Sequence, residues 1–250
     1  EDDFGDAINC TDLSDGTHAY QLQRLTEVGS VVRNCVNNRR RGKRLSAAAN
    51  WRSLLDANLP LMPQADEENE QESRARVEKT AALKELAESR ISVLIGPAGT
   101  GKTLLLAVLC SHPEISSGGI LLLAPTGKAR VRMEQAAKEH RVALRGFTIA
   151  QFLSRCGRYD GSTGQYRLST QPKETPAKTL IIDEASMLTE EMLAAVIDGL
   201  SGVERLILIG DPRQLPPIGA GRPFVDIISE LAPQDIQSRF PKVGPGYAEL

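Results

Sequence analysis

A glycine-rich segment, GPAGTGKT at residues 96–103, limits the possible architectures of this chain more than any other part of it. It follows the apolar run ISVLI and precedes the apolar run LLLAVL, so it joins a predicted strand to a predicted helix. Glycines let backbone N–H groups turn inward around phosphates, and a helix that starts at the loop directs its positive end at them. The spacing G-x-x-x-x-G-K-T therefore predicts a nucleotide-binding loop in an α/β domain.

The loop also supplies side chains suited to phosphate chemistry. Lys102 can reach the outer phosphates, and the hydroxyl of Thr103 can bind Mg²⁺. ATP and Mg²⁺ are the cofactors that this pattern predicts. The predicted nucleotide-binding residues form one continuous stretch: Gly96, Pro97, Ala98, Gly99, Thr100, Gly101, Lys102, Thr103 and Leu104.

A second apolar run, TLIIDEASML, ends in two acidic residues. Alone, Asp183 and Glu184 could be a solvated strand end or a helix cap. About eighty residues after a phosphate loop they form a matched pair, in which Asp183 holds the Mg²⁺ shell and Glu184 polarises the attacking water. The adjacent glutamate favours hydrolysis over phosphoryl transfer to a small acceptor.

Hydrophobic periodicity around these motifs alternates between strand and helix. This alternation predicts a parallel sheet covered by helices on both faces. The predicted strands are 91–95, 119–124, 179–182 and 205–209, with a short run near 143–147. The predicted helices are 102–111, 128–139, 149–155, 189–199 and 224–231. Two aromatic-bearing runs around Asp-Gly predict a β-hairpin within residues 156–176.

The first quarter of the chain has a different pattern. We expect an irregular acidic stretch over residues 1–15, followed by helices at 17–36, 46–55 and 73–89 and an acidic linker at 59–73. The basic run NNRRRGKR at 37–44 is interpreted as a solvated loop between helices, with a nucleic-acid phosphate contact as the alternative. The predicted domains are an N-terminal helical region with its linker at 1–66 and an ATPase domain at 67–250.

Composition excludes some classes of protein. The net charge of −2 gives no global reason for a polyanion to bind, so a nucleic-acid surface would have to be local. No apolar stretch approaches the ~20 residues that span a bilayer. The four cysteines lie far apart without a CxxC pair, which disfavours a metal site and indicates a cytoplasmic protein with reduced thiols. The chain starts without methionine and ends in PGYAEL without an evident closing element, as expected for part of a longer protein.

Taken together, five motifs resemble a known family. GPAGTGKT, LLLAPTGKAR, TIAQFL, LIIDEASM and LIGDPRQLPPIGAG are similar to motifs I, Ia, Ib, II and III of superfamily 1 helicases. The closest similarity is to RecD-like enzymes, the alpha subunits of exonuclease V and their relatives, over about residues 75 to 230. The resemblance implies the first RecA-like motor domain of an ATP-dependent DNA helicase that translocates 5′ to 3′ on single-stranded DNA and unwinds duplexes.

The resemblance also implies roles for individual residues. Gln214 would contact the γ-phosphate, from a loop that borders the DNA, and prolines at 212, 216 and 217 stiffen that loop. The hairpin would be a wedge at the duplex fork, with a solvent flap as the alternative. The residues implied to contact DNA are Pro125, Thr126, Thr148, Tyr159 and Tyr166. Other implied partners are the second motor domain of the same chain and nuclease or repair subunits.

Two features depart from that family. Glu78 and Lys79 stand where many relatives have a Glu-Gln pair that recognises adenine, which leaves the choice between ATP and GTP open. Motifs IV to VI have no counterpart before Leu250, and their arginine finger contributes ~10³–10⁵ in rate. The 250-residue chain is therefore expected to bind nucleotide but hydrolyse it slowly.

Two alternatives from other classes remain. A regulatory module could use ATP only as a ligand, although the pair Lys102 and Glu184 argues against it. A P-loop ATPase could instead act on RNA or protein, against which Pro125 and Thr126 argue weakly.

Overall fold

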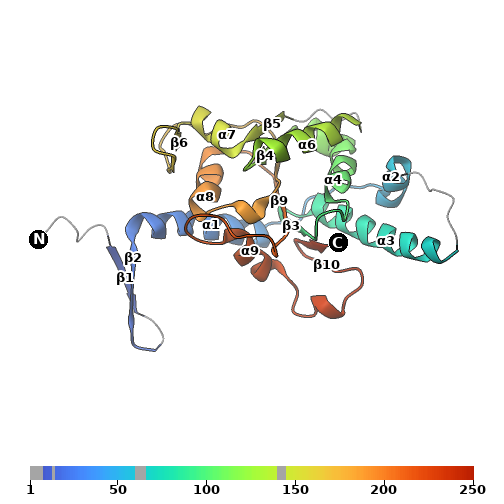
Figure 1. Cartoon of the computed structure of the whole chain (residues 1–250), viewed down its shortest axis with the longest axis horizontal. Coiled ribbons are helices and arrows are strands. Elements are labelled where there is room, and N and C mark those ends of the chain that lie inside the picture. The colour runs from blue at the N-terminus through green and yellow to red at the C-terminus, as the bar shows by residue number, and fades with distance from the viewer. Residues whose placement is uncertain (1–7, 13–14, 60–65, 140–144) are drawn as a thin grey trace, which may run out of the picture.

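The computed structural model describes residues 8–12, 15–59, 66–139 and 145–250. A seven-stranded sheet lies at the centre of the molecule, with helices packed against it (Figure 1). The strand order is β10-β11-β3-β9-β8-β4-β5, and every neighbouring pair is parallel except β10 with β11. The strands are β3 (Ile91–Ile95), β4 (Ile120–Ala124), β5 (Arg145–Thr148), β8 (Thr179–Ile182), β9 (Arg205–Gly210), β10 (Val243–Gly244) and β11 (Tyr247–Glu249).

Both faces of the sheet are buried, which is why the central strands read as continuous apolar runs. Alternate residues of β3 enter opposite cores: Val93 packs in one hydrophobic cluster and Leu94 in the other. The first cluster is covered by α1 (Gln23–Arg41), α7 (Ile149–Arg155), α8 (Glu190–Gly199) and α9 (Pro223–Leu231). The second is covered by α2 (Trp51–Asn58), α3 (Asp66–Glu88), α4 (Lys102–Ser111), α5 (Pro113–Ser117) and α6 (Gly127–Glu139).

The predicted fold class, an α/β P-loop domain with a parallel sheet covered on both faces, is confirmed. Cys110 is buried in the core, and burial raises the pKa of its thiol to about 12. The predicted hairpin is present as β6 (Tyr159–Asp160) paired antiparallel with β7 (Gln165–Tyr166). Within the described residues, no helix is long and apolar enough to cross a bilayer.

The N-terminal prediction is wrong at its start. Residues expected to be irregular or helical instead form an antiparallel hairpin, β1 (Ile8–Asp12) with β2 (His18–Leu22). The first helix begins only at Gln23 and continues to Arg41, through part of the basic run that we expected to be a loop. Its last turn is held because the Arg39 guanidinium donates to the carbonyl oxygens of Arg90, Val203 and Glu204 at 2.8 to 3.2 Å.

Other boundaries also shifted. The second helix starts at Trp51 because the side chain of Asn50 caps it, accepting a hydrogen bond from the Ser53 N–H at 3.0 Å. The acidic segment expected to be a linker is helical from Asp66, as the start of α3. The remainder of that linker, 60–65, and residues 140–144 before β5 lie outside the described part of the chain.

The strands β10 and β11 were not revealed by the sequence. Tyr247 pairs with Val93, so β11 lies parallel to β3, and β10 pairs with the other side of β11 at the edge of the sheet. Three residues of strand were too few for a periodicity signal, and their pairing with β3 is a long-range contact.

Candidate nucleotide-binding site

The predicted phosphate and metal residues converge at the carboxyl edge of the sheet. The phosphate loop follows β3, Asp183 and Glu184 follow β8, and the segment with Asp211 and Gln214 follows β9, which lies between β3 and β8. Their side chains and backbone surround a cavity of about 340 Å³. The lining residues are Ala98, Gly99, Gly101, Lys102, Thr103, Leu104, Arg132, Asp183, Glu184, Gly210, Asp211 and Gln214.

The phosphate loop has a backbone that needs glycine. Gly99 and Gly101 both have φ of 87°, in the left-handed region that costs a residue with a Cβ. The helix α4 begins directly at Lys102, so its N-terminal end points into the cavity. This geometry is suited to an anion with several oxygens.

Lys102 lies folded against its own loop. Its ammonium donates to the carbonyl oxygens of Gly96 and Pro97 at 2.6 and 2.7 Å. Partial burial lowers the pKa of Lys102, and the nearby carboxylates of Asp211 and Asp183 oppose that shift. The Lys102 ammonium therefore lies near acidic groups and at the wall of the cavity.

Asp183 is buried and its carboxylate is oriented by two contacts. Oδ1 accepts the Glu184 N–H at 2.9 Å, and Oδ2 pairs with the exposed guanidinium of Arg132 at 3.2 Å. Together with the Thr103 hydroxyl, which lines the same cavity, this carboxylate offers the oxygen ligands that Mg²⁺ prefers. The residues present thus fit a magnesium nucleotide.

Glu184 is held by backbone and side-chain constraints. Its φ is +52°, and it is the one residue other than glycine with positive φ in the part of the chain that the structure describes. Its carboxylate oxygen Oε2 accepts a hydrogen bond from the Thr126 hydroxyl at 3.2 Å. The Thr126 hydroxyl oxygen also accepts the Ala129 N–H at 3.3 Å, capping the first turn of α6. Thr126, which the family resemblance implies to contact DNA, is therefore hydrogen-bonded to Glu184, the carboxylate expected to activate water.

Gln214 lies at the mouth of the cavity on a constrained turn. Its side chain is exposed, while its backbone N–H donates to the Asp211 carbonyl at 3.1 Å. The Asp211 carboxylate in turn accepts the Arg213 N–H at 3.0 Å. Gln214 also lines a second, smaller cavity with prolines 212, 216 and 217 and with Phe224 of α9. The turn therefore connects the nucleotide cavity to the packing of α9.

The profile of the AAA domain family matches residues 75–237, well over half of the chain, and spans all of these site residues. The chain belongs to the AAA domain family. The match covers the region from the middle of α3 to the segment after α9.

The chain is also similar to curated proteins. It is 29% identical, over 88% of its length, to an uncharacterised protein of Methanocaldococcus jannaschii, of which it covers 19%. It is 29% identical over 64% of its length to RecBCD enzyme subunit RecD of Mycolicibacterium smegmatis, covering 31% of that protein. It is 30% identical over 62% of its length to the ATP-dependent RecD2 DNA helicase of Deinococcus radiodurans, covering 20%. The chain thus spans a fifth to a third of the length of these relatives.

The AAA domain places the predicted DNA residues at the same edge of its sheet. Pro125 and Thr126 follow β4, and Thr148 ends the adjacent strand β5. The Thr148 hydroxyl caps α7, accepting the Gln151 N–H at 3.2 Å, while the Gln151 side chain accepts the Thr148 N–H at 3.0 Å. Thr148 therefore has a structural role whether or not it contacts a ligand.

The hairpin of the AAA domain combines a fixed base with an exposed tip. Tyr159 and Tyr166 are cross-strand partners with ring centroids 4.8 Å apart, half-buried against the core. Arg158 is fully buried at the base, where it pairs with Asp198 at 2.8 Å and donates to the carbonyl oxygens of residues 156, 169 and 171. The base of the hairpin is therefore anchored in the fold.

Two charged residues that line the cavity, Arg132 and Asp211, were not singled out in the sequence. Asp211 stands within the motif GDPRQ, and Arg132 lies two residues after PTGKAR, so these motifs were the available signal. Lys79 of α3 has its ammonium 3.7 Å from where a Cβ on Gly101 would lie. Its departure from the family pattern was noted, but its closeness to the loop required the packing of α3.

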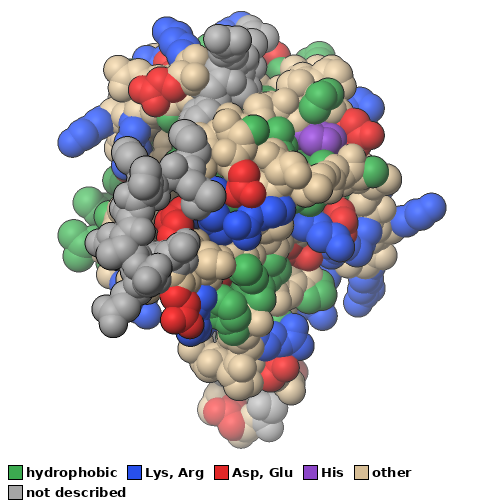
Figure 2. Space-filling model, turned by 90° about the vertical axis from the view of Figure 1, so that its right-hand side faces the viewer, with side chains coloured by type: hydrophobic (Ala, Val, Ile, Leu, Met, Phe, Trp, Pro, Cys, Tyr) green, Lys and Arg blue, Asp and Glu red, His purple; other side chains and the backbone are tan. Residues whose placement is uncertain are grey.

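Charge elsewhere on the AAA domain is mixed. Figure 2 shows basic and acidic side chains interspersed over one face, in keeping with a net charge of −2. Affinity for a polyanion would therefore have to come from specific contacts more than from the overall field.

Proposed function

We propose that this chain is the ATP-binding motor domain of a RecD-like, superfamily 1 DNA helicase, which couples ATP hydrolysis to movement on single-stranded DNA and to duplex unwinding. The observation that carries the proposal is the hydrogen bond between Thr126 and Glu184. It joins a residue of the motif that resembles a DNA contact to the carboxylate that would activate water. Similarity to a protein named ATP-dependent RecD2 DNA helicase supports the same assignment.

In this proposal each group of residues has its own role in binding or hydrolysis. Lys102 and the loop N–H groups bind the phosphates, Thr103 and Asp183 hold Mg²⁺, and Glu184 takes a proton from the attacking water. Magnesium supplies charge neutralisation on the phosphate oxygens when bound. Gln214 would contact the γ-phosphate from a turn that also reaches α9. Pro125, Thr126 and Thr148 would contact the DNA backbone, and the hairpin with Tyr159 and Tyr166 would separate the duplex at the fork.

We further propose that the full-length protein contains a second motor domain whose arginine closes the site. The 250-residue chain alone would then bind ATP and hydrolyse it slowly, since such an arginine contributes ~10³–10⁵ in rate. Nuclease or repair subunits are the proposed partners of the full-length protein, because two relatives are subunits of RecBCD enzymes.

The test is to measure ATP affinity and ATPase rate in the full-length protein, with single-stranded DNA, RNA or no nucleic acid. Wild type should be stimulated by DNA. Glu184→Gln should keep its ATP affinity and lose hydrolysis by ~10²–10⁴, the usual contribution of a general base. Lys102→Ala should lose ATP binding, because the lysine ammonium would pair with the negative charge that the phosphates of ATP already carry before hydrolysis.

Three results would contradict the proposal. Equal turnover by wild type and Glu184→Gln would remove this residue from the reaction. Stimulation by RNA but not DNA would favour the RNA-dependent alternative. ATP binding without hydrolysis under any condition would favour a regulatory module.

A further inference from the structure

The hairpin formed by β1 and β2 lies outside the catalytic fold and carries three metal-binding side-chain types. In Figure 1 it extends from the start of α1 away from the body of the molecule. Its register pairs Cys10 with Tyr20 and Asp12 with His18. Because alternate strand residues share a face and cross-strand partners lie on the same side, Cys10, Asp12 and His18 all project from one face.

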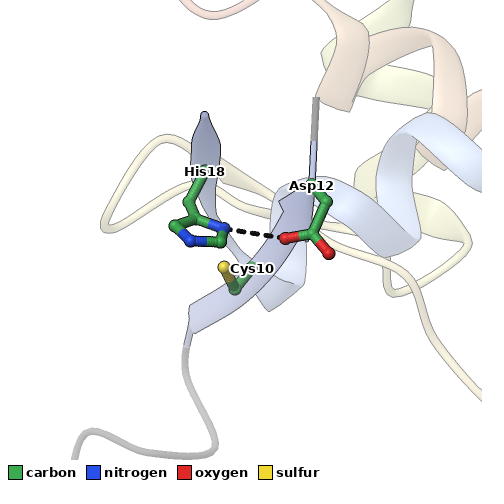
Figure 3. Close-up of side chains that lie close together, drawn as sticks. All are labelled: Cys10, Asp12 and His18. Carbon is green, nitrogen blue, oxygen red and sulfur yellow. Dashed lines mark hydrogen bonds and ion pairs between the residues drawn. The ribbon is translucent and has the colours of Figure 1, made fainter. Parts of the chain in front are cut away.

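The three side chains are already close together (Figure 3). A Cys10 sulfur, an Asp12 oxygen and a His18 ring nitrogen all lie within 4.8 Å of one another. The His18 Nδ1 is 2.7 Å from the Asp12 Oδ1. In a tetrahedral zinc site, bond lengths of about 2.0–2.3 Å place ligand atoms about 3.3–3.8 Å apart. The exposed side chains therefore need to move by only about 1 Å to enclose an ion.

The hairpin also needs a source of stability that its described side chains do not supply. A two-stranded hairpin on its own is marginally stable in water. The apolar residues on the same face, Ile8, Tyr20 and Leu22, are 46%, 71% and 54% exposed. Cross-strand packing on this face therefore buries little apolar area, whereas a metal bound by both strands would link them directly.

We propose that Cys10, Asp12 and His18 form a zinc-binding site that links β1 to β2. Thiolate, imidazole and carboxylate are a ligand set that Zn²⁺ accepts, and the thiolate disfavours Mg²⁺ and Ca²⁺. Three protein ligands leave the fourth position of a tetrahedral ion to water, because the face is exposed to solvent. The site is remote from the phosphate loop in sequence and fold, and the bound ion would cross-link the two strands.

Sequence spacing alone does not reveal this site. The segment has no CxxC pair, and its ligands are separated by one and by five residues. Only the antiparallel register, with Asp12 opposite His18, brings the second strand's ligand to the first two. Hairpin pairing therefore replaces the local repeat that usually marks a zinc site.

The experiment uses the 250-residue chain and Co²⁺ as a spectroscopic probe of the site, followed by Zn²⁺ competition. Wild type should bind one Co²⁺ per chain with a thiolate-to-cobalt absorption band, and Zn²⁺ should displace it. Cys10→Ser and His18→Asn should each weaken binding by at least about 100-fold, since even loss of an outer partner costs 10–100-fold. Cys35→Ser, which removes a half-buried thiol on α1, is the matched control and should bind like wild type.

ATP binding provides the folding check for each variant, because the nucleotide cavity does not include the hairpin. A thiolate band that persists in Cys10→Ser, half an equivalent of metal per chain, or no binding by folded wild type would each overturn the intrachain site.

Discussion

At the scale of single residues, the contact between Thr126 and Glu184 is the most informative one in the molecule. The Glu184 carboxylate oxygen that accepts the Thr126 hydroxyl has one lone pair engaged, and the direction of the carboxylate is fixed. DNA phosphate at Thr126 would compete for the same hydroxyl. The contact therefore offers a physical route by which DNA could control hydrolysis without any large movement of the sheet.

Thr126→Val keeps the shape of the side chain and removes the hydroxyl. We expect the ATPase rate of the full-length protein without DNA to rise by about tenfold or more, because a hydrogen bond to a charged group contributes ~1.5–3 kcal/mol. The ratio of DNA-stimulated to basal rate should fall by the same factor. The measurement is steady-state ATPase with and without single-stranded DNA.

Thr126→Ser is the matched control, since it retains the hydroxyl and should behave like wild type. Both variants need their thermal stability measured, because Thr126 also caps α6 and loss of a cap costs ~1 kcal/mol. A basal rate that falls in Thr126→Val would mean that Thr126 orients Glu184 productively instead of restraining it.

At the scale of elements, the hairpin of β6 and β7 has an anchored base and an exposed tip. The buried Arg158 fixes its base through an ion pair with the partly exposed Asp198 and three carbonyl contacts. Residues 161–165 at the tip are exposed. The tip can therefore be changed without disturbing the core, whereas the base cannot.

Replacing the exposed tip, residues 161–165, by a short Gly/Ser turn, with Arg158 and the two tyrosines retained, should leave DNA-stimulated ATPase of the full-length protein near wild type. Unwinding of a forked duplex should be lost, because a wedge acts only at the fork. Both rates are measured on the same preparation. Unwinding at the wild-type rate would reduce the hairpin to a surface element.

Arg158→Ala should instead destabilise the fold by ~1–3 kcal/mol, because the Asp198 carboxylate and three carbonyl oxygens lose their buried donor.

The elements also show where sequence reasoning succeeded and failed. The strands and helices around the phosphate loop were predicted because buried parallel strands are uniformly apolar and the motifs fix their ends. Most residues that line the cavity stand in those motifs, whereas Arg132 and Asp211 were not singled out. β1, β2 and β11 were missed because their existence depends on pairing: His18–Leu22 fits a helical period as well as a strand, and Tyr247 needs Val93 beside it. Arg132 was missed, and the closeness of Lys79 to the phosphate loop was not predicted, because helix packing brings both side chains to the site.

At the scale of the whole molecule, the N-terminal helices are part of the hydrophobic cores of the sheet. Val28, Val32 and Val36 of α1 are buried in the same cluster as alternate residues of β3 and β9. Trp51 and Leu55 of α2 are buried in the cluster on the other face. Arg39 joins α1 to the ends of the neighbouring segments through three carbonyls. The boundary predicted at residue 66 stays a prediction, and this packing suggests how to test it.

Deletion of residues 1–66 should leave the ATPase domain insoluble or greatly destabilised. A fully buried valine or leucine contributes ~1.5–3 kcal/mol, and several are lost from a fold whose total stability is expected to be ~5–15 kcal/mol. Deletion of residues 1–22 is the control, because it retains α1 and α2. The measurement is thermal unfolding of both truncated chains beside the 250-residue chain. Equal melting temperatures for all three would mean that the N-terminal region is an independent unit.

The strand β9 lies between β3 and β8, buried along its whole length, and it ends at the turn that carries Gln214. A strand shifted by one residue turns every side chain to the opposite face. Lineages that descend from such a chain could therefore add or remove residues at the exposed hairpin tip, but not within β9, without separating Gln214 from the phosphate loop. Length variation in homologous genes should follow the same division, with insertions tolerated at surface turns and excluded from the central strands.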